Sequence, residues 1–270
     1  MRRIVICGDD FGMNPAVDAA ILHLAGMGRM SAISCLSLGP SFAASADALH
    51  GHDVDVGLHL NLTESLGGVP AMPLSALIAR ACARRLDPAA IDTAVQRQLD
   101  AFERGYGRAP DYVDGHQHVH QLPVVLPRLL HALRRRYGAR RPWLRCTLPR
   151  LPRGMVPADA FKAWVIGALG GHALRRAARE DGWRTNTRLL GVYGLRGGAR
   201  LYDTLLRRWL AAAQEGDLLM CHPAVDAPSR TDVLWRQRAA EFAVLSGDGL
   251  VEALLQHGLA ARRLSRMQAQ

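Results

Sequence analysis

Apolar runs alternate with amphipathic segments along the first sixty residues. The run RRIVIC is rich in β-branched residues and stops before Gly8, so it predicts a short buried strand. Residues 14–30 follow with apolar positions at helical spacing, Asn14 as a candidate N-cap and Pro15 at the first helical position. The next segments predict a strand, a helix and a strand, namely SAISCLSL, SFAASADALH and VDVGLHLNL. This alternation predicts βαβ units around a mostly parallel sheet.

Residues 64–110 interrupt this rhythm. Two helical patterns rich in Ala, Arg and Gln follow each other there, at about 74–85 and 88–105. We interpret the region as a helical insertion near the open face of the sheet, where it would form a lid or a wall of a substrate site.

The second half of the chain resumes the pattern, with one irregular to helical stretch at residues 147–183. The expected strands are PDYVDGHQHVHQLP, RPWLRC, RLLGVYG and DLLMCHP, and the expected helices are 123–137, RLYDTLLRRWLAAAQ, 231–245 and 248–257. A length of 270 residues suits one α/β barrel or a doubly wound fold. Because the sequence shows no repeat, low-complexity tract or linker, we expect a single domain over residues 1–270.

The net charge of +10 has only a small effect on the expected partners. Almost all basic residues are arginines, since Lys162 is the only lysine, and they are scattered in short clusters without interleaved aromatic residues. A groove for single-stranded nucleic acid uses such aromatics to stack bases, so the pattern argues against nucleic-acid binding. Loose attraction to an anionic membrane surface or a glycolipid stays open.

The cysteines and apolar runs bear on the compartment. The five cysteines form no CxxC pair, and most lie in apolar runs, which is typical of buried, reduced thiols in a cytosolic protein. The apolar run at the N-terminus is too short for a signal-peptide core, and no stretch reaches the roughly 18–20 apolar residues of a membrane-spanning helix. We therefore expect a cytoplasmic protein, and a homodimer stays open.

Four groups of polar residues stand where an apolar run stops. In α/β sheets and barrels the carboxyl ends of the strands line one functional edge, so these side chains are expected to meet. The groups are Asp9 with Asp10, His59 with Asn61, Asp114 with His116, His118 and His120, and Cys221 with His222 and Pro223.

Three of these groups also have an ordinary structural explanation. Asp9 and Asp10 could cap a helix, although adjacent carboxylates repel each other unless a cation or a shared proton offsets the charge. His59 alone would suit a hydrogen-bonded core histidine, and His222 could stabilise a turn before proline.

The three closely spaced histidines are harder to explain as a surface feature. On an extended segment His116, His118 and His120 point to the same face, and a surface strand seldom needs that. If the segment instead bends after Asp114, only one or two of them face the site, and His120 supports the others from outside it.

One aspartate and two histidines form a set that holds a divalent metal with open positions for water and substrate. A second carboxylate beside them could act as a base on water, and a histidine from another strand could protonate a leaving group. The combination predicts metal-assisted hydrolysis and leaves the bond that is cut undefined. The chain has no GxGxxG motif after the first strand, no GxxxxGK[ST] motif for nucleotide phosphates and no GxSxG motif for a nucleophilic serine.

Four motifs together resemble a known family. CGDDFG, VGLHLNLT, VDGHQHVHQLP and CHP stand in the order found in the YdjC-like carbohydrate deacetylases, a group that includes chitooligosaccharide and hopanoid-associated deacetylases. The resemblance runs from about residue 3 to the C-terminal helices. It implies an α/β fold in the form of a single-domain distorted (β/α) barrel, similar to the polysaccharide deacetylase fold. It also implies a metal-dependent hydrolase that removes the N-acetyl group from an amino sugar.

The resemblance implies roles for individual residues. Asp10, His59 and His116 resemble the ligands of one divalent metal ion. These ligand types suit Zn²⁺, whereas the resemblance suggests Mg²⁺ or a loosely specified ion. Asp9 resembles the base that activates water, and His222 resembles the acid that protonates the departing amine.

The resemblance leaves other residues with supporting roles. Arg145 would orient Asp9 or stabilise charge. The residues expected to position the ligands or to contact the sugar are His118, His120 and Asn61. The choice among oligosaccharide, lipid-linked and nucleotide-linked substrates would be made by residues 64–110 and 147–183.

Two other functions stay open. The same chemistry would serve a hydrolase of another amide or ester. A non-catalytic module that binds sugar or metal is a third interpretation, but such a module would need neither Asp9 nor His222.

Overall fold

A parallel sheet forms the centre of the molecule. A computed structural model of the chain describes residues 1–68, 71–227 and 232–267. Within these residues the strands pair in parallel in the order β5-β4-β3-β2-β1-β7-β6, with β8 beside β1. The strands are β1 (Arg2–Phe11), β2 (Ala32–Cys35), β3 (Asp55–Leu60), β4 (Tyr112–Gly115), β5 (Trp143–Leu144), β6 (Leu189–Leu190), β7 (Leu218–Cys221) and β8 (Leu259–Ala261).

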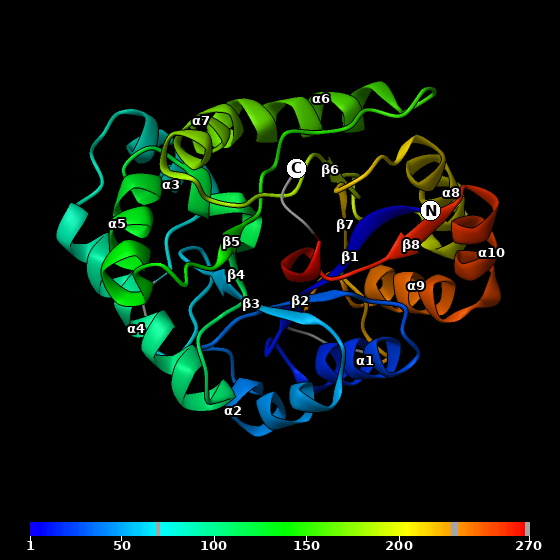
Figure 1. Cartoon of the computed structure of the whole chain (residues 1–270), viewed down its shortest axis with the longest axis horizontal. Helices are drawn as coiled ribbons and strands as arrows, with labels where there is room; N and C mark the ends of the chain where they lie inside the picture. Colours follow the sequence, from blue (N-terminus) through cyan, green and yellow to red (C-terminus); the bar gives the residue numbers. More distant parts are fainter. Residues whose placement is uncertain (69–70, 228–231, 268–270) are drawn as a thin grey trace.

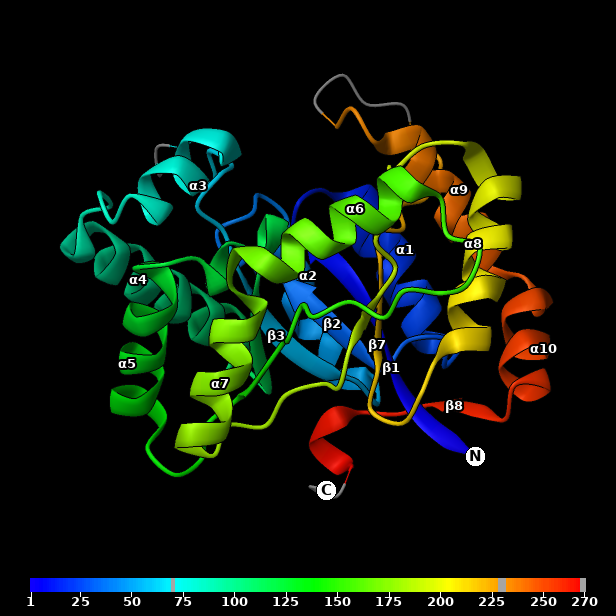
Figure 2. The same cartoon turned by 90° about the horizontal axis from the view of Figure 1, so that it is seen from above.

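Helices surround the sheet on its outer side (Figure 1). Seen from above, α6 crosses over the strands, whereas α4 and α5 lie at one side and α8, α9 and α10 at the other (Figure 2). The helices are α1 (Pro15–Gly26), α2 (Phe42–Ser45), α3 (Leu74–Cys82), α4 (Pro88–Tyr106), α5 (Val125–Tyr137), α6 (Pro157–Ile166), α7 (His172–Asp181), α8 (Gly198–Ala212), α9 (Trp235–Ser246) and α10 (Asp248–Gln256).

The sheet curls into an incomplete barrel. Its two end strands are β5 and β6, and isolated bridges from Leu144 to Thr185 and from Pro149 to Leu189 join the two ends in place of a regular ladder. Helices cover the outside of the sheet, and the pairing described is parallel throughout. The prediction of an α/β distorted barrel is therefore confirmed.

Strand β1 shows how the sequence alternation builds the two faces of the sheet. Val5 and Cys7 pack inside the barrel, in one cluster with residues such as Tyr112 and Trp143. Ile4 and Ile6 pack on the opposite face, against the helices. Since side chains alternate along a strand, the next residue on the inner face after position 7 is position 9.

The predicted start of α1 is confirmed. The Asn14 side chain accepts hydrogen bonds from the backbone N–H groups of Ala16 and Val17, both at 3.0 Å, and Pro15 is the first helical residue. A side-chain cap of this kind satisfies N–H groups that have no partner within the helix. The turn between β1 and α1 is thereby fixed at the end of the strand that carries Asp9 and Asp10.

Residues 64–110 contain α3 and α4. The apolar face of α4, which includes Val95, Leu99 and Phe102, is buried, and α4 packs against β3 and α5. In this position α4 serves as the crossover helix between β3 and β4. That the region is an insertion and a lid remains a prediction.

The histidine segment departs from an extended strand. β4 ends at Gly115, and residues 116–121 form a turn of 3₁₀ helix in which Gln117 and His118 have positive φ values of 52° and 62°. The expectation that three histidines share one face of a strand is wrong, because this turn sends them in different directions. The alternative, a bend after Asp114, is confirmed.

Candidate active site

Asp9 and Asp10 lie near the C-terminal end of β1, and their carboxylates contact different partners. Both side chains are buried. Asp10 has a φ of 73°, and the register of β1 against β2 shifts between Gly8 and Phe11. A left-handed conformation is uncommon for a residue other than glycine, and such strain is often found at functional sites. In a regular strand Asp9 and Asp10 would point to opposite faces of the sheet, whereas here Asp10 lies against His59 and His116, and Asp9 pairs with Arg145 at the same edge of the sheet.

Asp10, His59 and His116 come together as predicted from the sequence. The Nδ1 atom of His116 lies 2.9 Å from Asp10 Oδ1, and the Nε2 atom of His59 lies 3.5 Å from the same oxygen. One potential ligand atom from each of these residues lies within 4.8 Å of the other two. Two nitrogens and one carboxylate oxygen therefore converge on a single point.

The partner of His59 on its other side determines which ring nitrogen faces this point. Parallel pairing of β3 with β4 sets His59 opposite Asp114, and His59 Nδ1 lies 2.7 Å from Asp114 Oδ1. A carboxylate only accepts hydrogen bonds, so Nδ1–H donates to Asp114. In the neutral ring the Nε2 lone pair then faces Asp10 Oδ1. A cation between them removes this repulsion, so the donor set fits a divalent metal ion.

The charge around His59 supports this assignment. Burial lowers the pKa of His59, but the carboxylates of Asp114, Asp10 and Asp9 outweigh it and raise the pKa to about 10. Burial also acts against the charged form of His116, yet Asp10 and Glu64 raise its pKa. The point at which these side chains converge therefore attracts positive charge.

Arg145 fixes the carboxylate of Asp9. The guanidinium is fully buried and donates to both Asp9 oxygens, from Nη1 to Oδ2 and from Nη2 to Oδ1, each at 2.6 Å. Its Nη2 atom also lies 2.6 Å from Asp114 Oδ2. Burial raises the pKa of Asp9, but Arg145 outweighs it and holds the pKa well below its usual range. Asp9 is therefore held as an ionised carboxylate.

His222 lies on the other side of Asp9. The regular pairing of β1 with β7 ends at Gly8 and Cys221, so the next residues on the two strands, Asp9 and His222, are neighbours. The Nε2 atom of His222 lies 3.9 Å from Asp9 Oδ2. The candidate base and the candidate proton donor thus lie at the ends of adjacent strands, beside the three candidate ligands.

Of the three residues predicted to contact a sugar, Asn61 and His120 have other hydrogen-bond partners in this structure. Asn61 donates to the carbonyl of Glu64 at 2.7 Å and accepts from the backbone N–H groups of Thr63 and Glu64. His120 is buried with Nε2 2.9 Å from the Arg145 carbonyl, and burial lowers its pKa to about 4. The neutral ring therefore donates to that carbonyl. Burial also lowers the pKa of His118.

Sequence reasoning missed three contributors to the site. Arg238 and Glu241, both on α9, contact Asp10 and the backbone of His222, and Glu64 Oε1 lies 3.7 Å from His116 Nε2. The sequence carries no strong signal for them, because Glu64 follows the VGLHLNLT motif without being part of it, and Arg238 and Glu241 are two of many charged residues on expected helices. The spacing of three between Arg238 and Glu241 places both on one side of a helix, which is the only sequence cue.

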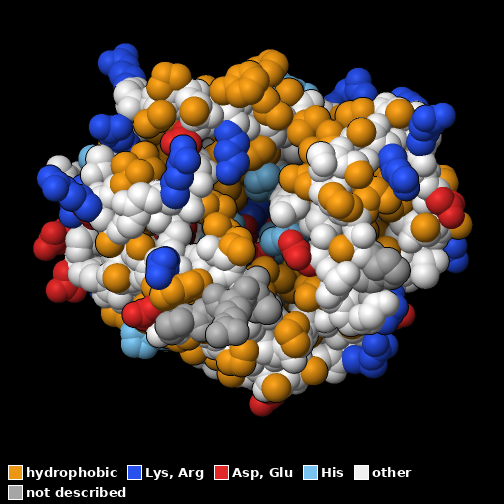
Figure 3. Space-filling model, turned by 180° about the vertical axis from the view of Figure 1, so that it is seen from behind, with side chains coloured by type: hydrophobic (Ala, Val, Ile, Leu, Met, Phe, Trp, Pro, Cys, Tyr) orange, Lys and Arg blue, Asp and Glu red, His pale blue; other side chains and the backbone are white. Residues whose placement is uncertain are grey.

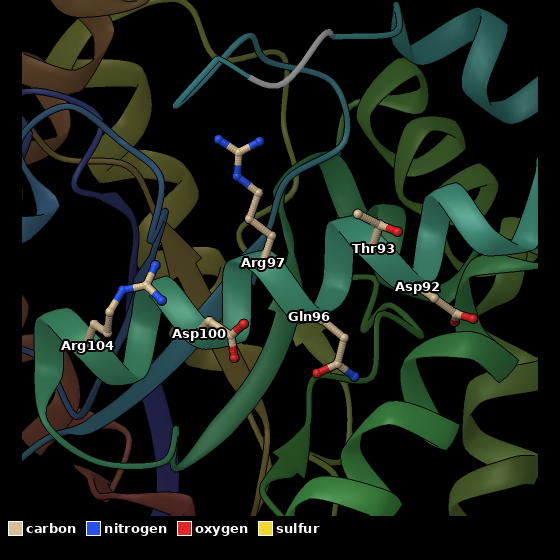
Figure 4. Close-up of a pocket in the computed structure, with 6 residues that line it drawn as sticks. All are labelled: Asp92, Thr93, Gln96, Arg97, Asp100 and Arg104. Atoms are coloured by element: carbon tan, nitrogen blue, oxygen red, sulfur yellow. The ribbon is translucent and has the colours of Figure 1, made fainter.

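The surface has a hollow in which histidine and acidic side chains gather, with hydrophobic side chains around it (Figure 3). A second hollow lies along the exposed side of α4. Its lining residues are Asp92, Thr93, Gln96, Arg97, Asp100 and Arg104 (Figure 4). None of the candidate site residues lines this second hollow, so we assign it no part in the chemistry.

Solved structures share the fold. A protein from Enterococcus faecalis named for cellobiose-phosphate cleavage superposes with a TM-score of 0.66 at 19% identity, covering 97% of each chain. A peptidoglycan N-acetylglucosamine deacetylase superposes with a TM-score of 0.55 at 11% identity, covering 98% of this chain and 87% of that one. At these identities the likeness establishes the fold alone.

Sequence relatives extend over nearly the whole chain. A human carbohydrate deacetylase is 29% identical, with 95% of this chain and 88% of the relative covered. A chitooligosaccharide deacetylase from Serratia marcescens is 25% identical, with 95% and 96% covered. The model of the YdjC-like protein family matches residues 3–256. The chain therefore belongs to the YdjC-like protein family.

Proposed function

We propose that this protein is a metal-dependent carbohydrate N-deacetylase, which hydrolyses the N-acetyl group of an amino sugar and releases acetate. The observation that carries the proposal is the convergence of Asp10, His59 and His116 beside the Asp9–Arg145 pair and His222. The family and the names of the relatives support the same reaction.

Asp10, His59 and His116 would hold one divalent ion. A bound ion would act as a Lewis acid on the acetyl carbonyl and lower the pKa of water at the site. One carboxylate and two imidazoles suit Zn²⁺ by ligand type, and Mg²⁺ remains the alternative. Asp114 holds the His59 ring so that its free nitrogen faces the ion position.

Asp9 and His222 would move the protons. Arg145 keeps Asp9 ionised and fixes both of its oxygens, so that Asp9 can take a proton from the attacking water. His222 would give a proton to the sugar nitrogen as the C–N bond breaks. The products are then acetate and a free amino sugar. With two such groups, one proton can be removed from the water while another is supplied to the nitrogen.

The class of N-acetylated sugar that serves as substrate remains a proposal. An oligosaccharide, a lipid-linked glycan and a nucleotide-linked sugar all contain the group that reacts. His118 and His120 each have a buried Nδ1 atom without a hydrogen-bond partner among the described residues. Contact of a sugar with His118, His120 or Asn61 stays a prediction.

Contact with an anionic membrane or glycolipid also remains a proposal. None of the described helices is long and apolar enough to cross a bilayer. Residues 151–164 support peripheral contact, because they expose large apolar side chains and two basic ones. These are Leu151, Val156, Phe161 and Trp164, with Arg153 and Lys162. Co-sedimentation with phosphatidylglycerol vesicles and not with phosphatidylcholine vesicles is the expected result. A cytoplasmic location and a homodimer stay predictions.

Acetate release from a panel of N-acetylated sugars tests the proposal. The panel contains chitooligosaccharides, a nucleotide-linked N-acetylglucosamine and a glycolipid, each with and without a chelator. We expect release from at least one member, loss on chelation and recovery when Zn²⁺ or Mg²⁺ is restored. Release of another acyl group, or of acetate from esters only, would favour a different amide or ester hydrolase. No release from any member, with one metal per chain, would favour a binding module.

A further inference from the structure

One turn of α9 sends two buried charged side chains to the candidate site from positions three apart. Arg238 and Glu241 are 3% and 0% exposed. A buried charge is costly unless it is paired. The partners of these two residues therefore indicate their role. Each contacts a different strand end of the site, and neither belongs to the four motifs found in the sequence.

Arg238 holds one oxygen of Asp10. Its Nη2 atom donates to Asp10 Oδ2 at 2.7 Å, and its Nε atom lies 2.9 Å from Asp232 Oδ2, so the guanidinium is itself anchored. With Oδ2 engaged, Oδ1 is the oxygen that faces His59 and His116. Rotation of the Asp10 carboxylate would move Oδ1 away from His59 and His116, and the three ligand atoms would no longer converge.

Glu241 holds the backbone at His222. Its Oε2 atom accepts from the His222 backbone N–H at 2.6 Å, and its other oxygen accepts from the Tyr193 hydroxyl. Gln237, one turn earlier on α9, also donates to that hydroxyl. Since β7 ends at Cys221, this contact fixes the first residue beyond the strand, where regular pairing with β1 has stopped.

We propose that Arg238 and Glu241 are positioning residues for the two halves of the site. Arg238 aims Asp10 Oδ1 at the metal position, and Glu241 sets the place of His222 relative to Asp9. Because both lie on one rigid helical turn, α9 fixes the separation of the metal ligands from the proton donor. The part played by Glu241 in turnover rests on the proposed function, whereas the part played by Arg238 in metal binding does not.

Titration with Co²⁺ alone tests Arg238 without any assay of turnover. We expect Arg238→Met to raise the Co²⁺ Kd about 10–100-fold, as loss of a partner to a metal ligand does in other sites, and to shift the visible absorption of bound Co²⁺. Arg238→Lys should recover part of the affinity, since an ammonium supplies charge and one donor. Arg236→Gln is the matched control, because Arg236 lies on the exposed side of the same helix and its loss should change neither readout.

Two outcomes would overturn the assignment of Arg238. One is a folded Arg238→Met variant with the Co²⁺ affinity and spectrum of the wild type. The other, should Arg238→Met fail to fold, is an Arg238→Lys variant that also matches the wild type in both. A loss of thermal stability without a change in Co²⁺ affinity would likewise assign Arg238 a structural role only.

Glu241→Gln tests the second half. The neutral amide oxygen is a weaker acceptor than the carboxylate for the His222 N–H, and the amide NH2 group then faces the Tyr193 hydroxyl, which can no longer donate there. We therefore expect faster exchange of the His222 amide hydrogen, measured by NMR, with Co²⁺ affinity unchanged. In the acetate assay kcat should fall about 10-fold or more with KM retained, because small misplacement of a reacting group is costly. Unaltered exchange and kcat would overturn the role of Glu241. If the wild type releases no acetate, the proposed function fails, while amide exchange and the Co²⁺ titrations still decide whether α9 positions these groups.

Discussion

Arg145 donates one hydrogen bond to each carboxylate oxygen of Asp9, both at 2.6 Å, in a fully buried pair. The two oxygens cannot rotate, and the carboxylate stays ionised although it is buried. The same guanidinium lies 2.6 Å from Asp114, which in turn holds His59. Arg145 therefore links Asp9, the candidate base, to His59, a candidate metal ligand, through Asp114.

Replacement of Arg145 by Met should damage both turnover and stability. Breaking a buried ion pair by removing one partner costs about 3–5 kcal/mol, and Asp9 would lose its fixed geometry. We expect at least an approximately 100-fold loss of acetate release, measured beside urea unfolding. Arg145→Lys should fold better than Arg145→Met but recover little activity, because an ammonium lacks the planar fork of a guanidinium. Full activity in either variant would contradict the role of Arg145.

Replacement of Asp114 by Asn should weaken metal binding without removing a ligand. The amide oxygen can still accept from His59 Nδ1–H, but the negative charge that strengthens the ligand is lost. We expect the Zn²⁺ Kd, measured by calorimetry, to rise about 10–100-fold. An unchanged affinity would show that Asp114 serves only to pair with Arg145.

Removal of metal should lower the melting temperature. A ligand that binds only the folded state stabilises it by mass action, by about 2.7 kcal/mol at a hundred times its Kd. Addition of Zn²⁺ to chelator-treated protein should therefore raise Tm, and Asp10→Asn should remove most of that rise. A Tm rise of the same size in Asp10→Asn would place the ion elsewhere.

Glu103 on α4 supports a prediction about stability away from the site. A hydrogen bond from Arg136 and another from Tyr137 outweigh partial burial and hold the pKa of Glu103 below its usual value. A depressed pKa stabilises the fold above the unfolded-state value of about 4.3, and this gain is lost as pH falls through the lower folded-state pKa. Glu103→Gln should cost about 1 kcal/mol or less at pH 7, given solvent screening. The difference from wild type in urea unfolding should vanish in acid.

The alternation of apolar runs and amphipathic segments predicted much of the fold. The Asn14–Pro15 helix start appears in the structure where the sequence placed it, and β1 starts as predicted but continues to Phe11, beyond the predicted end before Gly8. The convergence of Asp10, His59 and His116 followed from their positions at strand ends, since parallel strands bring such ends to one edge. The sheet places Asp10 and His59, whereas His116 is the first residue of the turn that follows β4.

Other features could not be decided from the residues alone, including which of the two alternatives for the histidine segment holds. The bend in the histidine segment requires positive φ at Gln117 and His118. Glutamine and histidine do not by themselves indicate such a conformation. The contact of Arg238 with Asp10 joins positions 228 residues apart. The sequence does not distinguish the buried Arg238 from the many exposed arginines, because its burial depends on how α9 packs.

The most direct test of the account separates the candidate base from the metal site. Asp9→Asn keeps the shape of the side chain and leaves Asp10, His59 and His116 in place. With Zn²⁺ or Mg²⁺ saturating and one ion bound per chain, we predict that this variant releases acetate at least about 100-fold more slowly than the wild type. Acetate release at the wild-type rate by metal-loaded Asp9→Asn would contradict the mechanism.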